Sequence, residues 1–206
     1  NQQQLELARR TSLSAARCFA VSEKFCRLLE RQLGIPTLRW EEIPNIIEQK
    51  FIDAKLPVQS TVIEPFILLT ISLLTENKAI HNIIFAFKRA FNNNSSIILK
   101  IGGDGIERPR LEALAVKLGV EDRVLFLGML TREQVLKEIS NSNTFVLSSY
   151  YETFGVVIIE ALALGKPVIA TRCGGPESIV RKQDGILVPT GDVSPLAEAM
   201  KNIRSE

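Results

Sequence analysis

The feature of this sequence that most constrains its fold is a regular alternation of short apolar segments with longer amphipathic ones. The apolar segments predict strands, at 66–72, 97–102, 124–128, 144–149, 167–171 and 185–188. The amphipathic segments predict helices, at 80–91, 109–119, 132–140, 154–164 and 195–203. Apolar strands that alternate with helices indicate a parallel sheet covered on both faces. Right-handed crossovers then give a doubly wound, Rossmann-like α/β fold, in which ligands bind beyond the carboxyl ends of the strands.

A different pattern precedes this region. It predicts helices at 1–15 and 22–33 and strands at 18–21 and 38–45. Ser22 stands where it can cap the second helix. Residues 46–60 show little periodicity and predict a connecting segment.

The segment between residues 148 and 175 carries the strongest functional signal. Glu160 is the only charged side chain between Phe154 and Leu164. A carboxylate in such apolar surroundings is costly unless hydrogen-bond donors meet it, and no Lys or Arg lies one helical turn away. We therefore expect the donor to come from elsewhere in the fold or from a ligand. A helix that starts near Phe154 also presents free backbone N–H groups, which predicts an anion site on the same short element.

The spacing in this segment resembles the donor-binding signature of retaining glycosyltransferases with the GT-B fold, most closely glycosyltransferase family 4. The signature runs through Glu152, Thr153, Phe154 and Gly155, then four apolar residues, to Glu160. The resemblance implies that a nucleotide diphosphate lies at the helix N-terminus. It further implies that Glu152 contacts the transferred sugar and that Glu160 takes the ribose hydroxyls as the partner it needs. Thr153, Phe154 and Gly155 would border the donor within the same motif.

A second part of the resemblance concerns the end of the first predicted strand of the regular region. Lys78 matches the lysine that binds and stabilises the donor diphosphate in the family. Leu73 stands where the family has an arginine, and Ala79 replaces a later glycine. Because leucine offers no hydrogen bond to phosphate, this departure weakens the expected donor binding. From the residues alone, a solvated lysine at a helix start is the simpler interpretation of Lys78.

Two further loops would border the donor. Gly103 belongs to a Gly-Asp-Gly turn that lacks the third glycine of a dinucleotide fingerprint, since Arg108 stands at that position. A glycine turn between strand and helix accounts for most of this pattern, and the resemblance adds that the turn shapes the donor cleft. Met129 and Leu130 follow the next predicted strand, where the family places the nucleotide base. These two side chains fit stacking on a base and packing in the core equally well.

Composition and charge limit which partners and which cellular compartment we expect for this protein. The formal net charge of the 206 residues is +2, which argues against a protein that wraps nucleic acid. Three cysteines without close pairing suit a reducing compartment and form no metal-binding motif. No apolar run is long enough to span a membrane, and no signal peptide opens the sequence. We therefore expect a cytoplasmic protein, with peripheral membrane contact where a lipid-linked acceptor requires it.

The resemblance covers nearly the whole chain and implies its domain organisation. Residues 1–45 would be the tail of an N-terminal, acceptor-side domain, 46–60 an interdomain linker, and 61–206 the nucleotide-sugar-binding domain. The sequence opens with Asn1 rather than methionine, so we expect a fragment. The implied reaction moves a sugar from a nucleotide diphosphate to a carbohydrate or lipid-linked acceptor hydroxyl with retention, without a metal or other cofactor. From the residues alone, 1–45 could instead be a β–α addition to the main domain.

Two other functions stay open. A sugar-nucleotide epimerase shares the architecture but not the spacing of acids around Phe154 and Gly155. A non-catalytic nucleotide- or partner-binding module would explain why Leu73 replaces an arginine.

Overall fold

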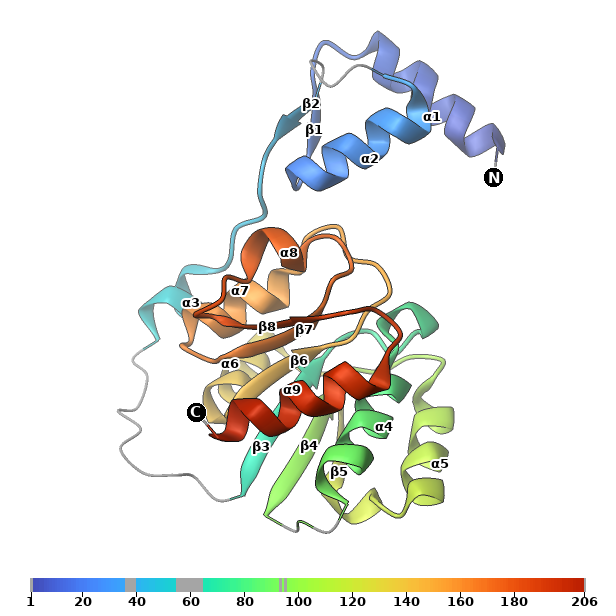
Figure 1. Cartoon of the computed structure of the whole chain (residues 1–206). Helices are drawn as coiled ribbons and strands as arrows, with labels where there is room; N and C mark the ends of the chain where they lie inside the picture. The colour runs from blue at the N-terminus through green and yellow to red at the C-terminus, as the bar shows by residue number, and fades with distance from the viewer. Residues whose placement is uncertain (1, 36–39, 55–64, 93, 95, 206) are drawn as a thin grey trace.

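The computed structural model describes residues 2–35, 40–54, 65–92, 94 and 96–205. Six parallel strands form one sheet in the order β5-β4-β3-β6-β7-β8 (Figure 1). The strands are β3 (Phe66–Ile71), β4 (Ile97–Gly102), β5 (Val124–Gly128), β6 (Thr144–Leu147), β7 (Val168–Thr171) and β8 (Gly185–Val188). They coincide with the six predicted segments, so the doubly wound α/β prediction is confirmed. The strand order reverses between β3 and β6, which is where ligands bind in such sheets.

Helices cover both faces of the sheet, as its apolar strands require. One face carries α4 (Ile80–Phe91), α5 (Arg108–Leu118) and α9 (Val193–Ser205), and the other carries α6 (Arg132–Asn141), α7 (Val156–Ala163) and α8 (Pro176–Ile179). Successive strand residues point to opposite faces, so Leu68 packs in one hydrophobic core and Leu69 in the other. The two cores hold the sheet rigid and leave the loops at its carboxyl edge to form a site.

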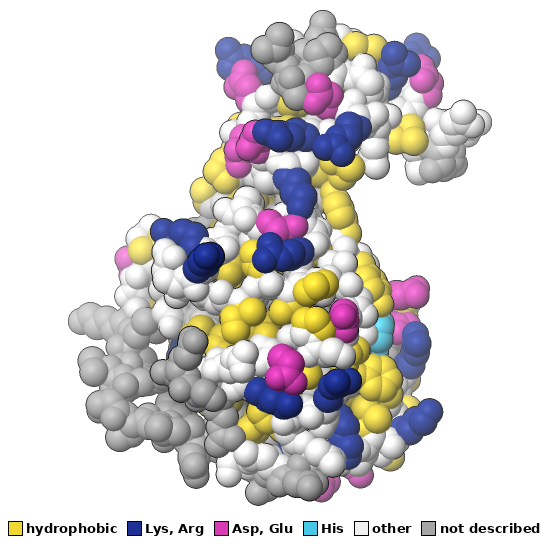
Figure 2. Space-filling model, viewed as in Figure 1, with side chains coloured by type: hydrophobic (Ala, Val, Ile, Leu, Met, Phe, Trp, Pro, Cys, Tyr) yellow, Lys and Arg dark blue, Asp and Glu magenta, His cyan; other side chains and the backbone are white. Residues whose placement is uncertain are grey.

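The N-terminal residues form a separate lobe, joined to the sheet domain by a narrow waist (Figures 1 and 2). It contains α1 (Gln2–Ser14), β1 (Cys18–Ala20), α2 (Glu23–Leu33) and β2 (Trp40–Glu42). Strands β1 and β2 pair in parallel with each other and not with the larger sheet. As predicted, Ser22 caps α2, since its Oγ accepts a hydrogen bond from the backbone N–H of Phe25 at 3.2 Å. Of the strand predicted at 38–45, residues 38 and 39 lie outside the described part, 40–42 form β2, and 43–45 were predicted wrongly because they continue without strand structure.

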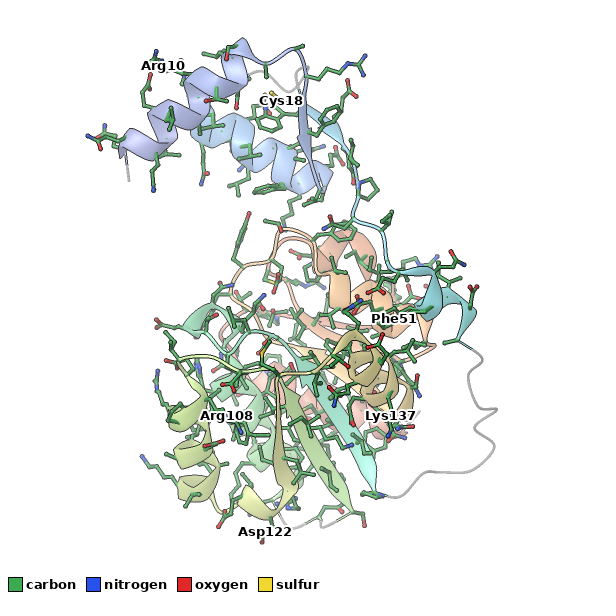
Figure 3. The ribbon with its side chains drawn as sticks, turned by 180° about the vertical axis from the view of Figure 1, so that it is seen from behind. Arg10, Cys18, Phe51, Arg108, Asp122 and Lys137 are labelled. Carbon is green, nitrogen blue, oxygen red and sulfur yellow. The ribbon has the colours of Figure 1, made fainter. Side chains whose placement is uncertain are left out.

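Several short helices were not predicted, namely α8, two 3-10 helices (Glu76–Lys78 and Glu121–Arg123) and α3. α3 (Gln49–Asp53) lies in the segment that the sequence suggested to be a connection. Phe51 at its centre is fully buried and joins the core formed with α6 and α7 (Figure 3). Five residues are too few to display a helical period, so the pattern could not reveal this helix. Residues 49–53 therefore pack on the sheet domain rather than running free between the lobes.

Candidate functional site

A cavity of about 320 Å³ opens at the carboxyl edge of β3 and β6, where the strand order reverses. We call it the switch-point cavity. It is lined by the loop after β3, a short 3-10 helix (Glu76–Lys78), the loop after β6 and the start of α7. Five predicted site residues line it, namely Lys78, Glu152, Thr153, Phe154 and Gly155. The fold thus joins two parts of the sequence that lie 74 residues apart.

Lys78 and Glu152 form an ion pair in the switch-point cavity. Nζ of Lys78 lies 2.5 Å from Oε1 of Glu152, and Oγ of Ser149 donates to the same oxygen at 2.7 Å. Their side chains are only 25% and 13% exposed. Ser148 Oγ donates to the carbonyls of Lys78 and Ala79, at 2.8 and 3.0 Å. These bonds fix the 3-10 helix against the loop after β6, and so fix the ion pair.

The N-terminus of α7 forms another wall of this cavity. The helix begins at Val156, slightly later than predicted, because Gly155 adopts a left-handed φ of 101° and stands at the N-cap. No side chain caps α7, and Val156 and Val157 line the cavity. The first backbone N–H groups of α7 are therefore available to an anion in front of them.

The loop before α7 is held from two sides. On one side, Ser22 Oγ of the N-terminal lobe donates to the carbonyl of Thr153 at 3.1 Å. On the other side, the backbone N–H of Gly175 donates to the carbonyl of Glu152 at 2.8 Å. A side chain at position 175 is impossible here, since its Cβ would lie 2.0 Å from the carbonyl oxygen of Phe154. The double glycine after β7 thus serves close backbone contact.

Glu160 lies on α7 but does not line the switch-point cavity, and it is only 2% exposed. Nη2 of Arg132 donates to its Oε1 at 2.6 Å. Arg132 also donates to Glu48 at 2.5 Å and lies over the ring of Phe51, 4.9 Å from its centroid. The two carboxylates, with Glu160 the larger cause, raise the pKa of Arg132. We call these four residues the Arg132 cluster.

The Arg132 cluster corrects one expectation. Glu160 does not need the ribose hydroxyls as its partner, because the fold supplies a cation. Arg132 is 28 residues away in the sequence, so a search within one helical turn could not find it. Arg132 is also the site residue that sequence reasoning missed, and its only signal was its place at the start of a predicted helix.

The Gly-Asp-Gly turn after β4 shapes the switch-point cavity without lining it. A Cβ on Gly103 would lie 1.9 Å from the carbonyl oxygen of Ser72, and the φ of Gly103 is 109°, so only glycine fits. The backbone N–H of Leu74 donates to the carbonyl of Asp104 at 2.8 Å. These contacts hold the loop so that Leu73 is 59% exposed and lines the cavity. An arginine at position 73 would therefore meet a ligand and not the core.

Met129 and Leu130 follow β5 and lie outside the switch-point cavity. Met129 is 71% exposed, whereas Leu130 is partly buried and packs against the core on the α6 and α7 side. The sequence left open whether these two side chains contact a ligand or pack in the core, and the structure gives a different answer for each. Leu130 packs in the core, and Met129 is exposed enough to contact a ligand.

A second cavity, of about 580 Å³, lies between α2 and the loops after β6 and β7. We call it the α2 cavity. Glu152 and Thr153 line both cavities. Tyr150 and Tyr151 also line the α2 cavity and are 44% and 42% exposed, and the hydroxyl of Tyr150 lies 3.3 Å from Nε2 of His81.

Other site chemistries find little support in the described ranges. No group of three or more His, Cys, Asp or Glu side chains is placed there to hold a metal ion. Cys18, Cys26 and Cys173 are free and buried, and burial raises the pKa of Cys173 to about 11. No helix in the same ranges has both the length and the apolar character needed to cross a membrane.

The sheet is that of one half of a GT-B glycosyltransferase fold, and comparison with known proteins gives the family. Residues 53–206 match the family described as Glycosyl transferases group 1, and the chain belongs to it. It is 34% identical over 138 residues to the lipopolysaccharide core biosynthesis glycosyltransferase LpsE of Rhizobium meliloti, covering 66% of this chain and 39% of LpsE.

Solved structures agree with this assignment. The sucrose-phosphate synthase of Thermosynechococcus elongatus superposes with a TM-score of 0.86 at 26% identity, over 100% of this chain and 53% of that one. HepE of Anabaena, in complex with UDP, superposes with a TM-score of 0.83 at 25% identity, over 100% of this chain and 58% of that one. The chain thus spans well under two thirds of the length of these relatives.

Proposed function

We propose that this chain is the donor-binding half of a retaining family 4 glycosyltransferase, which moves a sugar from a nucleotide diphosphate to an acceptor hydroxyl. The observation that carries the proposal is the Lys78–Glu152 pair beside the uncapped start of α7 in the switch-point cavity. A cation and free N–H groups suit a diphosphate, and an adjacent carboxylate suits sugar hydroxyls. Membership of the family and likeness to a UDP-bound relative support the same function.

The proposed reaction exchanges one carbon–oxygen bond for another. The bond from the anomeric carbon to the diphosphate oxygen breaks, the bond to the acceptor oxygen forms, and the acceptor proton leaves with the diphosphate. Negative charge grows on the diphosphate, where Lys78 and the N-terminus of α7 stabilise it electrostatically. The diphosphate would also draw Lys78 away from Glu152, which frees the Glu152 oxygens for the sugar. This scheme assigns no step to a metal or other cofactor.

A buried hydroxyl supports a ligand in this cavity. Ser72 lines the cavity, and its Oγ is buried without a hydrogen-bond partner among the described residues. Leaving a buried polar group unpaired costs roughly 1–3 kcal/mol. A phosphate or sugar oxygen that accepts from Ser72 would remove this cost on binding.

For Glu160 we propose ribose binding while Arg132 stays attached. A carboxylate can accept about four hydrogen bonds, and Arg132 engages one oxygen of Glu160. Because Glu160 is 2% exposed, ribose access requires a shift of the side chains beside it. Arg132 then acts as a positioning residue, and Met129 and the Gly103 turn border the nucleoside.

A non-catalytic nucleotide-binding module is the second candidate. It is favoured by Leu73, which lines the cavity with 59% of its surface exposed and brings no charge to a diphosphate. An assay of donor hydrolysis by a longer protein that includes this chain separates the two candidates. An enzyme releases nucleoside diphosphate from the donor, whereas a module binds the donor and leaves it intact.

Calorimetric titration of the 206-residue chain with nucleoside diphosphates and nucleotide sugars tests donor binding itself. We expect the chain to bind both ligands and, without the rest of an acceptor-side domain, to transfer no sugar. Lys78→Ala should weaken both ligands by about 1–3 kcal/mol, the scale of a charge-assisted hydrogen bond. Lys117→Ala, which removes an exposed lysine of α5, is the matched control. Equal affinities in Lys78→Ala and Lys117→Ala would contradict the proposed site.

A further inference from the structure

The α2 cavity is lined by an excess of cationic side chains. They are Lys24, Arg27 and Arg31 from α2 and Arg172 from the loop after β7. Glu23 and Glu152 are the acidic residues in the same lining. Figure 2 shows Lys and Arg side chains gathered at the waist where the N-terminal lobe meets the sheet domain, with an acidic side chain among them.

Two of these four cations are already neutralised. Lys24 pairs with Glu177 at 2.5 Å, and Arg27 pairs with Glu23. Arg31 and Arg172 are exposed, and neither has an ion-pair partner among the described residues. The unpaired positive charge of the cavity is therefore carried by these two arginines, one on each wall. Guanidinium groups bind phosphate through paired N–H donors, so such a cavity suits a phosphate group.

The shape of the fold places this charge next to the proposed reaction. Glu152 and Thr153 form the shared wall between the α2 cavity and the switch-point cavity. The hydrogen bond from Ser22 Oγ to the Thr153 carbonyl holds the start of α2 over this wall. A molecule in the α2 cavity thus lies next to Glu152, the residue that we propose to contact the sugar.

We propose that the α2 cavity binds an acceptor that carries a phosphate ester, with Arg31 and Arg172 holding the phosphate. This inference rests on the proposed function, because it assigns the substrate class of the same site. The acceptor hydroxyl then lies toward Glu152, and Tyr150 and Tyr151 offer half-exposed rings and hydroxyls to its sugar or polyol part. The phosphate ester is either that of a free sugar phosphate or that of a lipid headgroup.

Binding of glucose 6-phosphate tests the proposal, measured by calorimetry on the 206-residue chain with and without saturating UDP. We expect glucose 6-phosphate to bind beside UDP and glucose not to bind. The double variant Arg31→Gln/Arg172→Gln should bind it at least about tenfold more weakly, as expected from losing a charge-assisted hydrogen bond. Arg89→Gln, which removes an exposed arginine of α4, is the control and should leave binding unchanged. Both target side chains are exposed, so the double variant should fold. If it does not fold, the same titration is carried out with Arg172→Gln alone.

A second arm distinguishes the source of the phosphate. The chain is sedimented with vesicles of neutral phospholipid, with and without an anionic phospholipid. Binding that requires the anionic lipid and both arginines supports a lipid headgroup, whereas binding of glucose 6-phosphate alone supports a free sugar phosphate. No arginine-dependent binding of either probe overturns the proposal.

The two proposals fail in different ways. If UDP binds and neither phosphate probe does, the donor site stands and the acceptor class is wrong. If glucose 6-phosphate binds through Arg31 and Arg172 but no nucleoside diphosphate or nucleotide sugar binds, the anion site stands and the proposed function is wrong.

Discussion

Glu152 and Glu160 belong to one short motif, yet the structure gives them opposite surroundings. Glu152 lies in the switch-point cavity and pairs with Lys78, where a ligand can compete for either partner. Glu160 is 2% exposed and pairs with Arg132 outside that cavity, in a cluster that also contains Glu48 and Phe51 from the N-terminal side of the sheet domain. Two acids of one motif can therefore have different roles. We propose that the first carboxylate serves ligand binding, whereas the second is already paired within the fold before any ligand arrives.

We expect the loss of Arg132 to have the largest effect on stability. Arg132→Leu leaves the Glu160 carboxylate buried without its cation and uncovers Phe51, whereas Glu48 keeps its pairing with Lys50. Removing one partner of a buried pair costs 3–5 kcal/mol, and because Arg132 itself is 44% exposed we expect a smaller loss of about 2–4 kcal/mol. Urea unfolding followed by circular dichroism measures this loss.

A double variant provides the control for that experiment. Glu160→Gln/Arg132→Leu removes both charges, so it should recover a large part of the stability lost in Arg132→Leu. Glu160→Gln alone should cost less than Arg132→Leu, since Arg132 keeps Glu48 and contact with water. If Arg132→Leu and the double variant unfold at the same urea concentration, the two side chains are not energetically coupled.

Local features of this molecule could be predicted from the sequence, and long-range pairings could not. The strands, the Ser22 cap and the helix order follow from patterns within about a dozen residues. The Lys78–Glu152 pair spans 74 positions, and only the resemblance to a family suggested that these residues share a site. The pairing of Arg132 with Glu160 joins two helices that meet on the same face of the sheet, so no local pattern encodes it. The helix around Phe51 was missed because its burial depends on α7, not on its own periodicity.

The second expected effect separates the two carboxylates by ligand. Glu152→Ala should weaken the nucleotide sugar relative to the bare nucleoside diphosphate by about 1–3 kcal/mol, because we propose that Glu152 contacts only the sugar, whereas the loss of its pairing with Lys78 affects both ligands alike. Glu160→Ala should weaken both ligands alike, because both contain ribose, and it should also lower stability through the loss of its bond to Arg132. Titration of both variants with both ligands gives four affinities. Equal losses for both ligands in Glu152→Ala would mean that the two roles are assigned wrongly.

A gain of charge beside Glu152 should have a smaller effect. Leu73→Arg places a guanidinium on the exposed edge of the switch-point cavity. It should tighten nucleoside diphosphate binding by about 1–2 kcal/mol. This value is toward the low end for a charged hydrogen bond, because the position is exposed and salt screens the charge. Binding should also become more sensitive to salt. Leu73→Gln, similar in size but uncharged, is the matched control. Identical salt dependence in the two variants would show that residue 73 does not reach the phosphates.

The smallest expected effect concerns the backbone that carries Lys78. Ala79 is fully buried and has a φ of 48°, a left-handed conformation that costs a residue with a Cβ about 1–2 kcal/mol. Ala79→Gly relieves this strain but loses a buried methyl group of about 0.8 kcal/mol and adds backbone entropy to the unfolded chain, worth roughly 0.5–1 kcal/mol. The terms nearly cancel, so we expect stability within about 1 kcal/mol of the parent. Ala86→Gly, at an equally buried position inside α4, has no strain to relieve and should lose clearly more in the same urea titration. The Ala79 carbonyl also accepts a hydrogen bond from Ser148. If Ala79→Gly lost as much stability as Ala86→Gly, no strain would be stored at Ala79. The Lys78–Glu152 pair would then be positioned by the hydrogen bonds alone.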